Sequence, residues 1–167
     1  MSTTVVNSTK APAARQAPGI DWLRVASFVL VMVGLLDSIY ISYEHVAGQE
    51  VACLQGAGWN CDLVQRSVYS MIGPLPVAYL GLLGYLAIFL VLLFEARIPR
   101  ARIVIFGLSL FGLLFSGYLT AIEAFVLHAW CVWCVLSAIT MALFFLVAFG
   151  RLWQAIYTVP DEEDEAA

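Results

Sequence analysis

The sequence predicts an all-α integral membrane protein, a bundle of four transmembrane helices with a long outer loop between helices 1 and 2. Hydrophobic residues make up 62% of the 167 residues and charged residues only 12%, whereas soluble domains have about 45–50% and about 25%. A chain of this size cannot bury so many apolar residues in a soluble core, because its surface is too large for its volume. The few charges also exclude a disordered chain and a nucleic-acid partner, which requires a basic patch.

Four stretches contain the roughly 20 apolar residues that a helix needs to cross a bilayer. Apolar residues surround each stretch and do not form a single stripe, as lipid-facing helices require. The first stretch contains Asp37, and the third contains Glu123 near its end. The four expected spans are residues 25–43, 74–94, 103–127 and 131–149.

We expect the membrane domain to cover residues 20–156, between two polar ends. Residues 1–19 are rich in Ala, Pro, Ser and Thr, which predicts a disordered cytoplasmic leader. Residues 157–167 carry five acidic residues, which predicts a solvated cytoplasmic tail. Without those five, 7 acidic residues face 8 basic ones, so the net charge of −4 originates in the tail.

The basic residues predict the orientation, because Lys and Arg concentrate on the cytoplasmic side of a membrane protein. The loop at 45–73 contains only Arg66, whereas the other seven lie on the opposite side of the spans. We therefore expect an integral protein of the bacterial cytoplasmic membrane, with both termini in the cytoplasm and this loop outside. A loop of this length between neighbouring helices indicates a functional role.

All four cysteines fall on the expected outer side, where an oxidising compartment permits disulfides. Cys53 and Cys61 lie in the loop, separated by seven residues, and Cys131 and Cys134 begin the fourth span as Cys-Val-Trp-Cys. On a helix, the second spacing places both sulfurs on one face at a separation that suits a disulfide. At a helix N-terminus, the exposed N–H groups favour the thiolate of the first cysteine. These features predict a redox-active pair.

Two other interpretations of the cysteines remain open. Four cysteines can bind zinc, but zinc sites usually have two closely spaced pairs. The cysteines can also form two structural disulfides in a non-enzymatic four-span scaffold. In that case they never cycle between oxidised and reduced forms.

A further pattern combines these cysteines with a serine. Ser67 follows Cys61 by six residues, Gly-Pro-Leu-Pro stands at 73–76, and Leu-Asp-Ser-Ile-Tyr stands at 36–40. The combined spacing resembles the vitamin K epoxide reductase (VKOR) family, and more specifically its unfused bacterial homologues. The resemblance covers about residues 22–151.

The resemblance implies a quinone-dependent thiol–disulfide oxidoreductase with a role like that of DsbB. The loop pair would reoxidise a DsbA-like thioredoxin-fold protein and pass its electrons to the second pair. Cys61 would bond transiently to Cys131, and Cys134 would face a membrane quinone, menaquinone or ubiquinone, without a metal. About eighteen residues follow the fourth span, so we expect the thiol partner to be a separate protein.

The alternative function is a thiol-driven reductase of vitamin K epoxide or of quinones. Ala138 stands where animal members of the family carry a tyrosine associated with holding vitamin K. This difference weakens the alternative.

Five further residues are candidates for the quinone site. Ser67 is a candidate hydrogen-bond donor to a quinone carbonyl or a cysteine sulfur, although a turn bond also explains it. Asp37 and Glu123 are ionisable groups within spans, which are functional candidates by default, but interhelical bonds can also satisfy them. His128 is a candidate for favouring a thiolate or carrying protons. Tyr79 is a candidate pocket wall or interface anchor.

Overall fold

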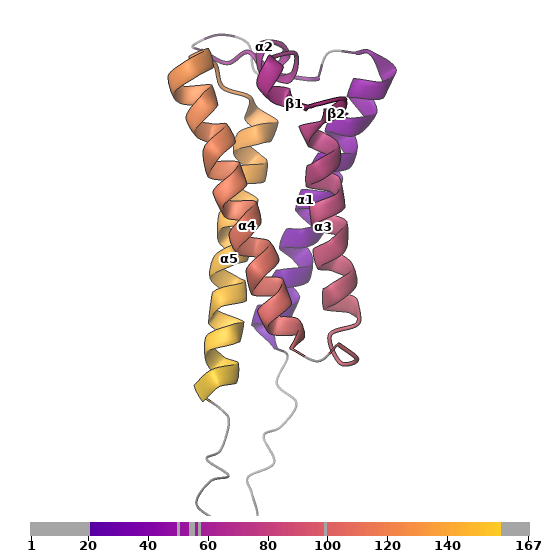
Figure 1. Ribbon diagram of the computed structural model, residues 1–167, viewed down its shortest axis with the longest axis vertical. Helices are drawn as coiled ribbons and strands as arrows, with labels where there is room; N and C mark the ends of the chain where they lie inside the picture. Colours follow the sequence, from indigo (N-terminus) through magenta and orange to yellow (C-terminus); the bar gives the residue numbers. More distant parts are fainter. Residues whose placement is uncertain (1–20, 50, 54–55, 57, 99, 158–167) are drawn as a thin grey trace, which may run out of the picture.

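Four long helices run along the longest axis of the computed structural model (Figure 1). They are α1 (Trp22–Ala47), α3 (Val77–Leu93), α4 (Ala101–Ile122) and α5 (Val132–Tyr157). The structure describes residues 21–49, 51–53, 56, 58–98 and 100–157. The expected leader at 1–19, and the expected acidic tail except for Tyr157, lie outside the described residues.

The helices have the length and composition of membrane spans. α1, α5 and the continuous stretch of α4 with the π-helical turn η2 (Glu123–Leu127) are each long and apolar enough to cross a membrane. α3 is apolar as well but has only 17 residues. The all-α membrane class is therefore confirmed.

A buried apolar core holds the bundle together. It includes Val31 of α1, Tyr85 of α3 and Phe144 of α5. A Cβ atom at Gly34 would lie 2.2 Å from Cε1 of the Tyr85 ring, so the missing side chain allows α1 and α3 to approach closely. Large apolar side chains such as Phe111, 70% exposed, cover the outer surface, as contact with lipid requires.

The second helix begins later than the sequence predicts. Residues 71–76 form a small antiparallel hairpin of β1 (Met71–Ile72) and β2 (Leu75–Pro76). Gly73 turns the chain with a φ of 62°, a conformation that glycine adopts without strain. Pro76 is the N-cap of α3, so the expected start at Pro74 is wrong by three residues.

The third span changes its winding near its end. α-Helical hydrogen bonding ends at Ile122, and the π-helical turn η2 carries the chain to His128, which has a φ of 50°. π-Helical turns occur frequently at functional sites. The sequence pattern gave no indication of this turn.

The last helix is longer than expected and extends eight residues beyond 149. Its end is fixed by an ion pair between Arg151 and Glu95, with Nη2 and Oε2 separated by 2.6 Å. The Trp153 and Tyr157 rings also contact each other in the last turns, tilted by 37° with their centroids 4.6 Å apart. These contacts stabilise the last turns of α5.

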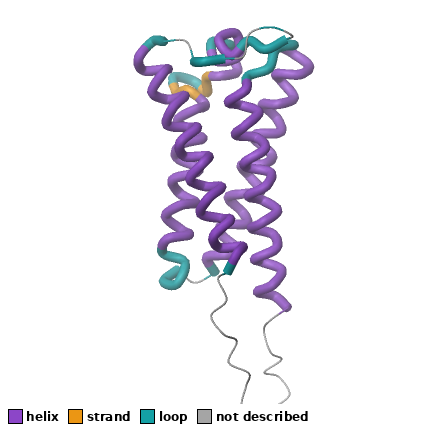
Figure 2. Tube along the Cα trace, turned by 180° about the vertical axis from the view of Figure 1, so that it is seen from behind, coloured by secondary structure: helices purple, strands orange, loops and turns teal. Residues whose placement is uncertain are grey.

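The described residues between 48 and 76 cover one end of the bundle, as both views show (Figures 1 and 2). Besides the hairpin, this segment contains the short helix α2 (Cys61–Gln65) and the 3-10 turn η1 (Val68–Ser70). The start of α1, the end of α5 and the α3–α4 connection lie at the opposite end. Which end faces the outside of the cell stays a prediction.

Candidate functional site

The first cysteine pair forms a disulfide within the 48–76 segment. The Cα atoms of Cys53 and Cys61 are 5.9 Å apart, and the Cys61 N–H donates to the Cys53 sulfur over 3.2 Å. Asn60 caps α2 by accepting a hydrogen bond from the Leu63 N–H, so Cys61 begins a helix. Cys53 is half-buried, whereas Cys61 is 1% exposed. Cys53 is therefore the more accessible sulfur of the disulfide.

The second cysteine pair consists of two free thiols at the start of α5. The backbone N–H of Cys134 donates to the Cys131 sulfur over 3.4 Å, which confirms the expected position at a helix N-terminus. A hydrogen bond from the Cys134 side chain lowers the pKa of the Cys131 thiol below its usual value. The thiolate is the form that attacks disulfides.

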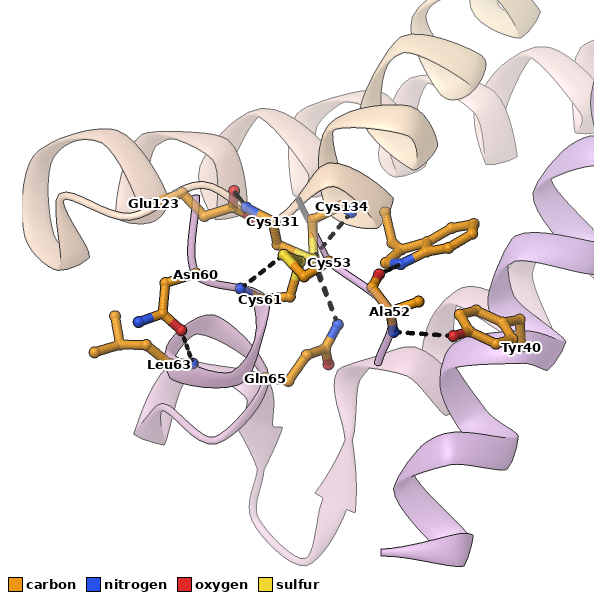
Figure 3. The surroundings of a disulfide bond; sticks show 11 residues. Tyr40, Ala52, Cys53, Asn60, Cys61, Leu63, Gln65, Glu123, Cys131 and Cys134 are labelled. Carbon is orange, nitrogen blue, oxygen red and sulfur yellow. Dashed lines mark hydrogen bonds between the residues drawn. A yellow bond between two sulfur atoms is a disulfide. The ribbon is translucent and has the colours of Figure 1, made fainter. Parts of the chain in front are cut away.

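A short backbone pairing joins the two cysteine pairs. The Asn60 N–H donates to the Trp130 carbonyl over 3.0 Å, and the Trp130 N–H donates to the Gly58 carbonyl over 2.9 Å. Each pairing residue lies next to or near a cysteine in the sequence. As a result, Cys61 and Cys131 are buried in one cluster (Figure 3).

Both backbone groups of Ala52 are held by side chains from the long helices. Its N–H donates to the Tyr40 hydroxyl over 3.1 Å, and its carbonyl accepts from Nε1 of Trp133 over 2.7 Å. The Tyr40 and Trp133 rings also contact each other, with centroids 4.6 Å apart. The residue before Cys53 is therefore attached to α1 and to the Cys-Val-Trp-Cys motif itself (Figure 3).

Gln65 is a site residue that was not predicted from the sequence. Its Nε2 lies 3.8 Å from the Cys131 sulfur and 3.7 Å from the Cys134 sulfur. It follows Cys61 by four residues, which places both on the same side of α2. This spacing is the one signal in the sequence that points to it.

Glu123 is a carboxylate that contacts both cysteines of the second pair. It is 3% exposed, and its Oε2 accepts a hydrogen bond of 3.0 Å from the Cys131 N–H. Its side chain also hydrogen-bonds to Cys134. The π-helical turn that begins at Glu123 gives this side chain its position beside both cysteines.

A cavity of about 350 Å³ lies between the long helices, next to the second pair. Its walls are mainly apolar, with a few polar side chains. Cys134 lines the cavity, whereas Cys131 is not among the described residues that line it. The two thiols therefore face different surroundings: Cys131 lies beside Cys61, and Cys134 borders the cavity.

The model of the Vitamin K epoxide reductase family matches residues 25–149, most of the chain. The chain belongs to the vitamin K epoxide reductase family. Membership indicates a thiol-based oxidoreductase, and VKOR proteins use quinones in general. The Cys53–Cys61 disulfide and the neighbouring thiols fit this activity.

Three of the five further candidates line the VKOR cavity: Ser67, Asp37 and Glu123. The Ser67 hydroxyl donates to the Val64 carbonyl over 2.8 Å, so it makes the ordinary turn bond and also borders the cavity. Asp37 is 5% exposed. Within the part of the chain that the structure describes, its carboxylate interacts with the Ser137 side chain but forms no hydrogen bond of ordinary geometry.

Tyr79 and His128 are not among the described residues that line this cavity. The Tyr79 ring packs edge-on against His45 of α1, with centroids 6.3 Å apart. His128 is exposed and forms the C-cap of the π-helical turn. Within the described residues, no group of three or more His, Cys, Asp or Glu side chains is arranged to hold a metal ion.

Proposed function

We propose that this VKOR protein reoxidises a separate DsbA-like thioredoxin-fold protein and passes the electrons through its two cysteine pairs to a membrane quinone. The supporting observation is the order of the sulfurs. Cys53 is half-buried at the end of the bundle, Cys61 and Cys131 are buried together, and Cys134 lines the cavity. This order matches a path from a soluble donor to a membrane acceptor.

In the first exchange, a thiolate of the reduced partner attacks Cys53, because the Cys61 sulfur is buried. A mixed disulfide forms, and Cys61 leaves as a thiolate. The second cysteine of the partner then attacks the partner's own sulfur in the mixed disulfide, and Cys53 leaves as a thiolate. The partner leaves oxidised, and Cys53 and Cys61 are reduced.

In the second exchange, Cys61 attacks Cys131 of an oxidised Cys131–Cys134 pair, and Cys134 leaves as a thiolate. Cys53 then attacks Cys61, which releases Cys131. The product has a Cys53–Cys61 disulfide and two reduced cysteines in the second pair, which is the bonding found in the structure. The low pKa of Cys131 favours its release, because thiols of low pKa are better leaving groups.

In the last step, the Cys131–Cys134 disulfide forms again, and a quinone in the cavity supplies the acceptor for two electrons and two protons. Glu123 holds the Cys131 amide and the Cys134 side chain, so it is placed to take the thiol proton. Gln65 donates toward both sulfurs and stabilises negative charge on them.

The cavity fits a quinone in size and chemistry. Small-molecule sites are about 300–1,000 Å³, mostly apolar, with a few polar groups. The Asp37 carboxyl lines the cavity and interacts with the Ser137 side chain, but it forms no hydrogen bond of ordinary geometry within the described residues, so it has capacity to bind a ligand. We propose that it binds the polar head of the quinone, menaquinone or ubiquinone.

The redox energetics agree with this acceptor. DsbA-like proteins are strong oxidants, with potentials of about −120 mV. Their reoxidation requires an acceptor that is comparably oxidising or is kept oxidised by respiration. A membrane quinone pool meets this requirement, whereas a glutathione pool does not.

The proposed location is the bacterial cytoplasmic membrane, with the cysteines outside and both termini in the cytoplasm. Arg24, Arg102 and Arg151 belong to the helix ends opposite the cysteine-bearing segment. Cytoplasmic ends of membrane proteins carry such an excess of basic residues.

The experiment compares membranes that contain the wild type, Cys53→Ser or Cys134→Ser. Quinone reduction is followed with a reduced DsbA-like protein or with a small dithiol as donor. We expect the wild type to use both donors and Cys53→Ser to lose only the protein donor. Cys134→Ser should lose activity with both donors. In this variant the Cys131 thiolate can attack Cys61 of the Cys53–Cys61 disulfide, with Cys53 leaving as a thiolate, so a Cys61–Cys131 disulfide should accumulate.

Two results would contradict the proposal. If folded wild type reduced neither menaquinone nor ubiquinone with either donor, the cysteines would be structural. If vitamin K epoxide were reduced faster than either quinone, the physiological acceptor would be the epoxide and the alternative function would apply.

A further inference from the structure

A second pocket lies at the other end of the molecule, far from the cysteines along the bundle. Its volume is about 700 Å³, and its walls come from the start of α1, the α3–α4 connection, the start of α4 and the end of α5. Four arginines line it: Arg24, Arg100, Arg102 and Arg151. They converge from separate parts of the sequence, so their proximity is a product of the fold.

Two acidic residues in the pocket neutralise only part of this charge. Glu95 binds both Arg102 and Arg151 through its two carboxylate oxygens. The Asp21 side chain accepts from the backbone N–H of Arg24, because it caps α1. Among the described residues, Arg24 and Arg100 form no ion pair.

One donor of Arg151 lacks an acceptor in this pocket. This residue is 5% exposed, and its buried Nε has no hydrogen-bond partner among the described residues. A buried unpaired N–H group of a charged side chain is costly unless something accepts from it. The neighbouring N-terminus of α4 adds the positive end of a 22-residue helix to the same pocket.

We propose that this pocket binds the phosphate group of an anionic phospholipid. The arginines provide the charge and the forked donors that a phosphate requires. Apolar side chains stand beside them: Ile103 and Ile156 line the pocket and are 54% and 61% exposed. This combination of arginine side chains and exposed apolar side chains suits a molecule with a phosphate head and acyl chains.

The test uses the purified full-length chain in a neutral detergent. Thermal unfolding and native mass spectrometry are recorded with phosphatidylglycerol, phosphatidylcholine or inorganic phosphate. The test variant is Arg24→Gln with Arg100→Gln, since neither side chain forms an ion pair within the described chain. Arg97→Gln is the matched control, because Arg97 lies in the same connection but its guanidinium rests over the Phe94 ring. A double lysine variant, Arg24→Lys with Arg100→Lys, tests whether positive charge alone is sufficient for binding.

We expect phosphatidylglycerol to bind and to raise the unfolding temperature of the wild type and of Arg97→Gln. The double glutamine variant should bind about 25-fold more weakly, the product of about fivefold for each arginine. The double lysine variant should recover most of the binding. Circular dichroism of each variant without lipid verifies that it is folded.

Three results would overturn the proposal. Equal binding of phosphatidylglycerol and phosphatidylcholine would mean that the pocket does not select an anion. Equal protection by inorganic phosphate would mean that it binds a free anion and no lipid. Unchanged phosphatidylglycerol binding in the folded double glutamine variant would place the lipid elsewhere.

Discussion

Oε2 of Glu123 accepts a hydrogen bond of 3.0 Å from the backbone N–H of Cys131. A carboxylate from the end of the third span is thereby fixed at the N-terminus of α5, beside both thiols. The first N–H groups of a helix have no partner within the helix, so Glu123 satisfies one of them. The same side chain is then in place for proton transfer at Cys134.

Replacing this carboxylate should separate its two roles. Glu123→Gln keeps an acceptor for the Cys131 amide but removes the group that takes a proton. We expect quinone reduction to fall about 100-fold, with little change in the unfolding temperature. Asp62→Asn is the matched control, because Asp62 is a half-buried acid on α2 that pairs with Arg66. An unchanged rate in Glu123→Gln would exclude proton transfer by Glu123.

Cys134 should control the ionisation of Cys131. Its hydrogen bond stabilises the Cys131 thiolate and lowers the pKa of that thiol, so removing the donor should raise this pKa. Cys134→Ala removes the donor, whereas Cys134→Ser keeps one. In protein with an intact Cys53–Cys61 disulfide, thiolate absorbance should require a higher pH in the alanine variant than in the serine variant. Identical titration curves would show that this bond has no effect.

The attachment of Ala52 should determine how fast the two cysteine pairs exchange. Trp133→Phe keeps the ring against Tyr40 but loses the Nε1–H bond to the Ala52 carbonyl. One such bond contributes about 0.5–1.5 kcal/mol, so we expect a threefold to tenfold slower rate with the protein donor. The rate with a small dithiol and the rate of a Trp153→Phe control should not change. Equal slowing with both donors would indicate general damage to the site.

We expect Asp37 to lower the stability of the fold and to contribute to quinone binding. Asp37 is buried and forms no hydrogen bond of ordinary geometry with the described residues. Burial of such a carboxyl costs free energy on folding, so Asp37→Leu should raise the unfolding temperature. The same variant should raise the KM for quinone, because the polar contact on the cavity wall is lost. Ser38→Ala, a neighbouring change on the same wall, is the control. A stable variant with an unchanged KM would show that Asp37 does not bind quinone.

Gly34 should be intolerant of even a methyl group. Its Cβ atom would lie 2.2 Å from the buried Tyr85 ring, and overpacking of this kind costs about 1–3 kcal/mol. Gly107→Ala is the matched control in α4, because nothing lies within 4 Å of a Cβ atom there. We expect a lower unfolding temperature for Gly34→Ala alone. Equal temperatures would mean that α1 and α3 separate easily.

Much of the site could be predicted from local sequence. The cysteine spacings predicted the two cysteine pairs that the structure brings together, and the Cys131–Cys134 spacing predicted a pair at a helix start because two positions one turn apart share a face. Asp37 and Glu123 stood out because charge inside an apolar span is expensive. Each of these signals depends on one residue type in one local context.

The sequence by itself determined the membrane class, since the excess of apolar residues has no place in a soluble protein of this length. It did not determine the hairpin before α3, the π-helical turn or the contacts of Gln65. The Ala52 attachment joins residues 81 positions apart, and the arginine pocket joins helix ends from the whole chain. Only the tertiary structure decided these contacts, because hydrogen bonds and ion pairs between distant residues depend on how the helices pack. Local sequence patterns do not predict that packing.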